Sequence, residues 1–381
     1  MPPTSRRAHH KSRGGCTTCK TKKVKCDEEQ PCSYCLKRQL PCSLAPSPSP
    51  SPGTEPGSSA KTPDIALARP YEALPKYSFI FNDFGLYRHF AMSTAIVQAD
   101  DNATMTIWQD VIADLATQHP YLLHEILAIA ALHKRSTMPD QADHLEHAAA
   151  EHQSRAIPLF REALASISAE TALPLFACSC LFIPYHFAAA KDAPSLLFNK
   201  DAGTLAEWLI LIQGCAAITM EHNATLMRSS LRALLGDLYT PKLDDLIGGP
   251  TDARLRDLES RLPITAEKSE IYANTMVKLR MCFYLSDRAD TVLNRKNAAL
   301  RFPPLMDRHF RADLEAKHPA ALIVMAFWCI LLHRVEDRWW LKERVKPLLF
   351  HIEELVPLEY RFLMTWPMGE VTVYPKARKY Y

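Results

Sequence analysis

Six cysteines lie close together near the start of the chain, and their spacing is regular. The spacing is C-x2-C-x6-C-x5-C-x2-C-x6-C, at Cys16, Cys19, Cys26, Cys32, Cys35 and Cys42. Thiolates are strong zinc ligands, and a structural zinc site is tetrahedral with four ligands. The first residues are basic and contain no apolar export segment, so we expect a reducing compartment, where thiols spaced in this way bind metal.

The number of thiolates predicts how the metal is held. Each C-x2-C pair and the cysteine that follows it offer three thiolates, one too few to close a zinc site. If each half shares one sulfur, six thiolates supply the eight bonds that two Zn2+ ions need. Two separate sites would need eight ligands, and residues 16–42 contain no histidine. Free or disulfide-bonded cysteines are the alternative, which the regular spacing disfavours.

The cysteine segment is too short and too polar to fold around a hydrophobic core. Its sizeable apolar side chains are Val24, Tyr34, Leu36 and Leu40. Bound zinc contributes about 10–16 kcal/mol to the folding of small zinc modules. We therefore expect the metal to supply the free energy of folding.

Positive side chains surround these cysteines and indicate a polyanionic partner. Residues 1–42 contain ten Lys or Arg and three acidic residues, a net charge of +7, which leaves −4 for the rest of a chain whose total is +3. The segment KTKKVK, residues 20–25, is predicted to form one or two helical turns. Lysines on a rigid zinc module can donate to guanine O6 and N7 in the major groove, while neighbouring cations contact phosphates. The alternative is a solvated run of charge. The predicted DNA-binding residues are Arg13, Lys20, Lys22, Lys23 and Lys25.

The stretch KSRGGCTTCKTKKVKCDEEQPC resembles the fungal binuclear zinc-cluster (Zn2Cys6) domain, more narrowly the subgroup that includes the sterol uptake control regulators. The resemblance implies that Cys16 and Cys32 are bridging thiolates. It also implies that Lys22 and Lys23 correspond to the base-contacting pair, which recognises CGG triplets or a related CG-containing element in double-stranded DNA. The loop DEEQP between the third and fourth cysteines is shorter than is usual in the family.

The composition changes sharply after the cysteine segment. Alternating Ser and Pro follow Cys42, a pattern typical of an extended linker. No heptad pattern follows the cluster, so binding by a single head or dimerisation through the C-terminal domain are the open alternatives. The predicted organisation is a basic arm (1–15), a Zn2Cys6 domain (16–42), a disordered linker (43–77) and a helical regulatory domain (78–381).

Apolar residues recur at a helical period after residue 78, and strand patterns are few. The fold class is therefore predicted to be all-α, with a small zinc cluster and a large helical C-terminal domain. The apolar stretch ALPLFACSCLFIPYHFAAA is interpreted as a buried core helix rather than a membrane span, because prolines and a histidine interrupt it. The predicted helices are 83–99, 105–118, 120–137, 140–168, 172–190, 203–221, 266–294, 319–334 and 338–355.

We found no pattern that indicates an enzyme. His144, His147 and Glu151 share one face of a predicted helix, but their neighbours are polar, so a solvated face is the better interpretation. The pair Asp244–Asp245 lacks the third acidic residue of a helical prenyl-transfer site. The chain contains no glycine loop of the kind that binds phosphate.

Three further stretches resemble the helical regulatory domain of the same subgroup. They are HPYLLHEILAIAALHKRS, AEWLILIQG and HPAALIVMAFWCILLHRVEDRWWL. The resemblance implies a nuclear, zinc-dependent transcription factor for RNA polymerase II genes, in lipid or sterol metabolism or a secondary-metabolite cluster. It further implies contacts with the transcription machinery and an apolar small-molecule ligand whose binding residues stay unassigned. Of the two open alternatives, a homodimer through the helical domain is favoured, because one small module rarely gives enough DNA affinity at cellular salt. The alternative is a sterol- or lipid-sensing receptor whose helical domain binds the ligand.

Overall fold

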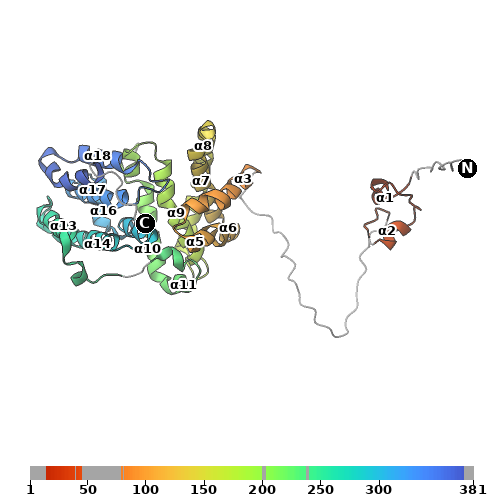
Figure 1. Ribbon diagram of the computed structural model, residues 1–381, viewed down its shortest axis with the longest axis horizontal. Coiled ribbons are helices and arrows are strands. Elements are labelled where there is room, and N and C mark those ends of the chain that lie inside the picture. Colours follow the sequence, from red (N-terminus) through yellow and green to blue (C-terminus); the bar gives the residue numbers. More distant parts are fainter. Residues whose placement is uncertain are drawn as a thin grey trace, which may run out of the picture. The chain divides into compact units, whose positions relative to one another are not determined.

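A computed structural model describes residues 14–38, 40–44, 79, 81–199, 203–236 and 240–372. Arg13 and nearly all of the predicted linker lie outside these residues. The chain divides into two compact units, Met1–Leu74 and Pro75–Tyr381, which Figure 1 shows and which we call the head and the helical unit.

The head contains two short helices, α1 (Thr17–Thr21) and α2 (Ser33–Lys37), that pack on each other. Each helix follows a cysteine of the predicted cluster and places the second cysteine of its C-x2-C pair on its inner side. Helix α1 ends earlier than the predicted helical segment 20–25, because Lys23 adopts a left-handed backbone conformation with φ of 55°. The prediction of helical turns over 20–25 is therefore wrong beyond Thr21.

The helical unit contains only helices, turns and one isolated β-bridge among its described residues. The prediction of an all-α body is confirmed. Helices α3–α4 and α5–α6 are each joined by a π-helical turn, at Phe90–Thr94 and Ile107–Ile112. The α-helices are α3 (Phe81–His89), α4 (Ala95–Gln98), α5 (Asn102–Thr106), α6 (Ala113–Gln118), α7 (Pro120–Thr137), α8 (Ala142–Ala165), α9 (Ala172–Ala189), α10 (Glu207–Glu221), α11 (Asn223–Arg228), α12 (Arg232–Leu235), α13 (Gly249–Arg261), α14 (Ser269–Asp287), α15 (Val292–Leu300), α16 (Arg308–Glu315), α17 (Pro319–His333), α18 (Val345–Leu355) and α19 (Thr365–Thr372).

Local capping explains where the structure departs from the predicted helix ends. The predicted helix 266–294 is two helices, because Arg288 ends α14 and the Thr291 hydroxyl caps α15 by accepting from Asn294 N at 3.1 Å. The predicted helix 338–355 begins only at Val345, after Glu343 adopts a φ of 61°.

Two central helices organise the core of the helical unit. Helix α7 packs against α3, α6, α8 and α9, and α17 packs against α14, α15, α16, α18 and α19. Both helices begin with proline at the first helical position, where the absent N–H costs no hydrogen bond. Thirteen of the fifteen residues of α17 are buried, so packing on all sides holds this helix in place.

Aromatic side chains join these two groups of helices. Trp208 of α10 stacks on Trp328 of α17 with ring centroids 6.3 Å apart, and Phe187 of α9 contacts both rings edge-on. The indole N–H of Trp328 donates to Ala299 O at 2.8 Å, which satisfies the one polar group of a fully buried side chain.

Helix α9 is long and apolar enough to cross a membrane by length and composition alone, and the bent pair α16–α17 meets the same criterion together. However, 72% of the apolar window of α9 is buried inside the helical unit. Such burial is typical of a core helix, in agreement with our interpretation of this stretch.

Candidate metal centre and nucleic-acid interface

The sulfur atoms of the six predicted ligands converge in the head. They form two groups of four, and within each group the sulfurs lie within 4.8 Å of one another. Both groups include Cys16 and Cys32, whose sulfurs are 3.7 Å apart. The first group adds Cys19 and Cys26, and the second adds Cys35 and Cys42.

Backbone N–H groups around the cluster favour ionised sulfur. Cys16 N donates to Cys26 Sγ at 3.4 Å, and Cys32 N donates to Cys42 Sγ at the same distance. The bond from Cys32 N and a second from Leu44 N lower the pKa of Cys42 to about 7, and the bond from Cys16 N lowers the pKa of Cys26. Burial raises the pKa of Cys19 and Cys35, so their thiolates depend on the charge of a bound ion. Four sulfurs around each site are the ligand set of structural zinc, so this donor set fits a pair of zinc ions.

The two cysteine halves are also tied together by polar contacts. The Asp27 carboxylate accepts from Ser33 N at the start of α2, at 3.1 Å, so the short DEEQP loop caps the second helix. The hydroxyl of Thr18 on α1 donates to Pro41 O at 2.6 Å. These contacts fix the orientation of α1 relative to the second half of the cluster.

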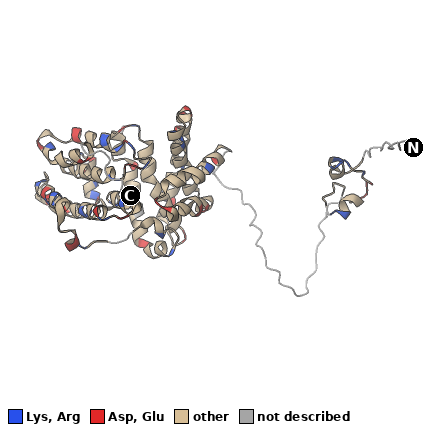
Figure 2. Cartoon of the chain, in the orientation of Figure 1, with Lys and Arg blue, Asp and Glu red and all other residues tan. Residues whose placement is uncertain are grey.

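The four predicted DNA-binding lysines of the described head are exposed. Lys20 lies on α1, Lys22 and Lys23 form the turn after it, and Lys25 follows in irregular chain. Val24, between them, packs against the cysteine cluster and anchors the segment. In Figure 2 the head shows Lys and Arg on and near both of its helices. In the second half, Arg38 stacks over the Tyr34 ring at 5.2 Å.

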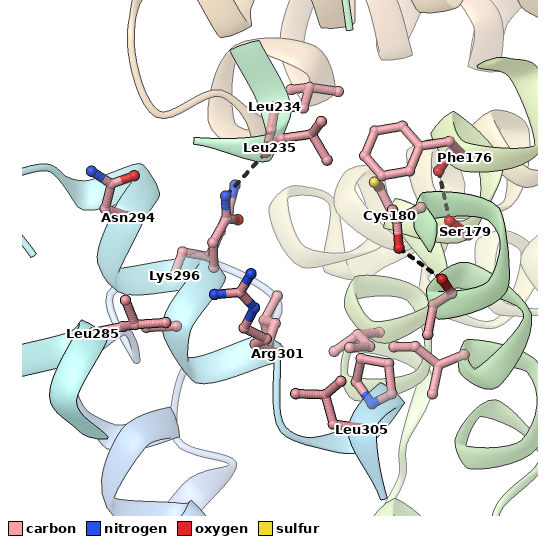
Figure 3. A pocket seen from close by; sticks show the side chains of 18 of the residues that line it. Phe176, Ser179, Cys180, Leu234, Leu235, Leu285, Asn294, Lys296, Arg301 and Leu305 are labelled. Carbon is pink, nitrogen blue, oxygen red and sulfur yellow. Dashed lines mark hydrogen bonds between the residues drawn. The ribbon is translucent and has the colours of Figure 1, made fainter. Parts of the chain in front are cut away.

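The sequence did not assign any ligand-binding residue in the helical unit, but the structure contains a cavity there of about 670 Å³. Figure 3 shows Phe176, Ser179 and Cys180 of α9 on one side and residues of α15 on the other. Lys296 of α15 and Arg338, which follows α17, also line the cavity. No local motif marks these cations, since the fold brings them together from distant segments.

The polar face that we considered as a catalytic or metal site shows no such convergence. His144, His147 and Glu151 are exposed on α8, and Glu151 pairs with Arg155 at 2.5 Å. They are absent from the groups of converging ligand atoms found in the described residues.

The head is thus built as a zinc-stabilised, basic DNA-binding module attached to a helical unit. Residues 14–51 match the family model described as the fungal Zn(2)-Cys(6) binuclear cluster domain, and residues 86–234 match the fungal specific transcription factor domain. The chain therefore carries the cluster domain and the regulatory domain of fungal Zn2Cys6 transcription factors, families that are not enzymes, and its cluster implies two zinc ions.

Several curated proteins are similar to the chain. A "Zn(2)-C6 fungal-type transcription factor" of Gibberella zeae is 26% identical over 90% of this chain and 81% of its own length. The "Zn(2)-C6 fungal-type transcription factor afumD" of Aspergillus fumigatus is 28% identical over 56% of this chain and 55% of its own length. "Sterol uptake control protein 2" of Saccharomyces cerevisiae is 25% identical over 77% of this chain, which spans 32% of that protein.

Proposed function

We propose that the head binds a CG-containing element of double-stranded DNA, with Lys22 and Lys23 contacting base edges and Lys20 and Lys25 contacting phosphates. The observation that supports this most directly is the exposed turn of Lys22 and Lys23, which is held on a rigid cluster. Lysine ammonium groups held in this way can donate to guanine O6 and N7. Arg13, outside the described residues, adds a phosphate contact in this proposal.

In the same proposal the six cysteines hold two zinc ions, with Cys16 and Cys32 as the bridging ligands. The two overlapping groups of sulfurs support this assignment. Zinc supplies the free energy that folds the head, and the chain's own residues supply all contacts to DNA. The predicted domain boundaries, 1–15, 16–42, 43–77 and 78–381, belong to this proposal as well.

The regulatory role that follows is control of RNA polymerase II genes in the nucleus. The targets belong to lipid or sterol metabolism or to a secondary-metabolite cluster. The distant similarity to sterol uptake control protein 2 supports the first of these target classes. The helical unit forms the homodimer contact and binds the transcription machinery.

Binding of the full chain to a CG-containing duplex tests this function. We expect the CG-containing duplex to bind at least about 1,000-fold more tightly than a scrambled one, with an affinity that falls steeply as salt increases. Equal affinity for the two duplexes would contradict sequence-specific binding. Mapping the protein on chromatin would then identify the target genes.

A second candidate function, sensing of a small molecule by the helical unit, is favoured by the cavity near α9 and α15. Its volume of about 670 Å³ lies within the range of small-molecule binding sites. Saturable binding of a lipid or sterol by the full chain supports this function, and the absence of any such binding contradicts it.

A further inference from the structure

Much of the wall of the cavity in the helical unit is apolar. Apolar side chains there come from α9, α10 and the segment around the end of α15. Figure 3 shows Phe176 on one side of the cavity and Leu285 and Leu305 from other segments. These walls fit a hydrocarbon chain or a fused-ring skeleton. The apolar lining residues include Phe176, Ile183, Pro184, Ile212, Leu285 and Leu305.

Three buried polar atoms of the cavity lining have no hydrogen-bond partner. They are Gln98 Oε1, Trp108 Nε1 and Arg338 Nε, and their residues are 6%, 3% and 9% exposed. Buried polar atoms are rarely left without a partner, because the lost hydration costs free energy. Arg338 also donates to Ala99 O at 3.0 Å, which places its guanidinium near Gln98 at the end of α4. Two donors and one acceptor are therefore available to a ligand's polar group.

The charged side chains that line the cavity are mostly positive. Asp100 is the shared ion-pair partner of Lys296 and Arg338, and Asp101, whose pKa is lowered by hydrogen bonds from Thr104, also interacts with the charge of Lys296. Arg288 and Arg301 also line the cavity, whereas Asp290 is the one acidic residue among its described lining residues. Burial lowers the pKa of Lys296, an effect that a second anion beside it would oppose.

We propose that this cavity binds an amphiphilic carboxylate, whose acidic group lies beside Arg338 Nε and Lys296, next to the pair that they form with Asp100, and whose apolar body contacts the walls from α9 and α10. This inference rests on the proposed small-molecule sensing and names the chemical class of the ligand. A ligand carboxylate accepts from Arg338 Nε and Trp108 Nε1 and balances the excess charge. A neutral sterol can satisfy single donors through its hydroxyl group, but it leaves that charge unbalanced.

The matched probes are oleate and oleyl alcohol, which share one chain and differ in the charged group. Cholate and ergosterol compare a charged and a neutral ligand with a rigid ring skeleton, although this pair also differs in its hydroxyl groups and side chain. Isothermal titration of each probe into the zinc-loaded full chain, below the micelle concentration, measures the affinities. We expect the carboxylate to bind at least about tenfold more tightly than its neutral partner, as a charged hydrogen bond in a buried site predicts. Comparison of oleate with cholate shows whether the preferred carboxylate is carried by a hydrocarbon chain or by a fused-ring skeleton.

Two variants in the cavity locate the binding site, and a third variant outside the cavity serves as a control. Lys296→Met removes one cation and should reduce carboxylate affinity about tenfold while affecting the alcohol little. Leu305→Trp places an indole in the cavity and should weaken every probe, which keeps the test valid if Lys296→Met fails to fold. Lys342→Met changes an exposed lysine outside the cavity lining and should leave all affinities unchanged.

The outcomes separate the two proposals. Carboxylate preference that Lys296→Met abolishes supports the assigned ligand class. Equal or tighter binding of oleyl alcohol or ergosterol overturns that class while leaving small-molecule sensing intact. If no probe binds to the folded wild-type chain, both the ligand class and the sensing function are contradicted.

Discussion

Cys16 Sγ and Cys32 Sγ lie 3.7 Å apart, and each belongs to both groups of four converging sulfurs. Each half of the head contributes one sulfur to this pair and two further sulfurs to its own group. This arrangement allows six thiolates to give each of two metal ions a complete tetrahedral set.

Removal of a shared sulfur should affect both metal ions. We expect Cys32→Ser to lose both zinc ions and DNA binding, because each four-sulfur group loses a ligand. Cys42→Ser removes a sulfur of one group only and should retain more zinc than Cys32→Ser does. Zinc content of the purified variants by native mass spectrometry checks this. A Cys32→Ser protein with one tightly bound zinc and unchanged DNA affinity would argue against sharing.

Removal of Lys23, which we propose contacts bases, should change specificity rather than general affinity. We expect Lys23→Ala to cost about 1–3 kcal/mol at the CG-containing site and much less on random DNA. Alanine and lysine tolerate the left-handed conformation at this position similarly, so folding of the head should change little. Lys37→Ala, an exposed lysine in the second half, is the control. Equal losses on both duplexes would place Lys23 on phosphate instead.

Chelation of zinc should unfold the head but leave the helical unit folded. We expect EDTA to abolish DNA binding, since the apolar residues of the head cannot replace the metal. The helical unit has its own core, so most helical circular dichroism should remain. Complete loss of helicity on chelation would show that the helical unit depends on zinc as well.

The sequence predicted the cluster well because ligand number and spacing directly determine metal coordination. The long helices α7, α9 and α17 were also predictable, since their apolar residues follow helical periodicity. Polar helices such as α13 and α16 were missed. Helix α16 buries only Phe310 and Leu314, so its sequence resembles a loop until tertiary contacts are known.

The cavity could not be predicted, for a different reason. Its cations pair with Asp100 from the turn after α4, while Lys296 lies nearly 200 residues further along the chain. Residues that far apart show no joint pattern in a single sequence. The three-dimensional arrangement alone reveals that they share one carboxylate.

The aromatic junction of the core should dominate the stability of the helical unit. We expect Trp328→Ala to lower the free energy of unfolding by about 3–5 kcal/mol, because it leaves a cavity beside Trp208. Phe362→Ala is the control, since that side chain is 59% exposed. Thermal and urea unfolding measure the difference. If Trp328→Ala lowers the free energy of unfolding no more than Phe362→Ala does, the aromatic junction does not dominate the stability of the helical unit.

Buried histidines should make the helical unit sensitive to acid. Burial lowers the pKa of His186 to about 4, while its Nε2 lies 2.9 Å from Ser195 O. An unfolded histidine binds a proton near pH 6.5. The unfolded state therefore binds more protons between pH 6.5 and 4, and stability is lost as pH falls through that range.

The matched variant is His186→Gln, whose side-chain amide can donate to Ser195 O without titrating. We expect its melting temperature to fall less between pH 6.5 and 4 than that of the wild type. His147→Gln, at an exposed position on α8, should leave the pH dependence unchanged. Parallel profiles for wild type and His186→Gln would exclude His186 as a cause of acid sensitivity.

The number of zinc ions per chain tests the central claim most directly. Native mass spectrometry of the purified full chain should show two zinc ions, held by six thiolates. A stoichiometry of one or three zinc ions per chain would contradict the shared-sulfur cluster and, with it, the rigid presentation of the lysines to DNA.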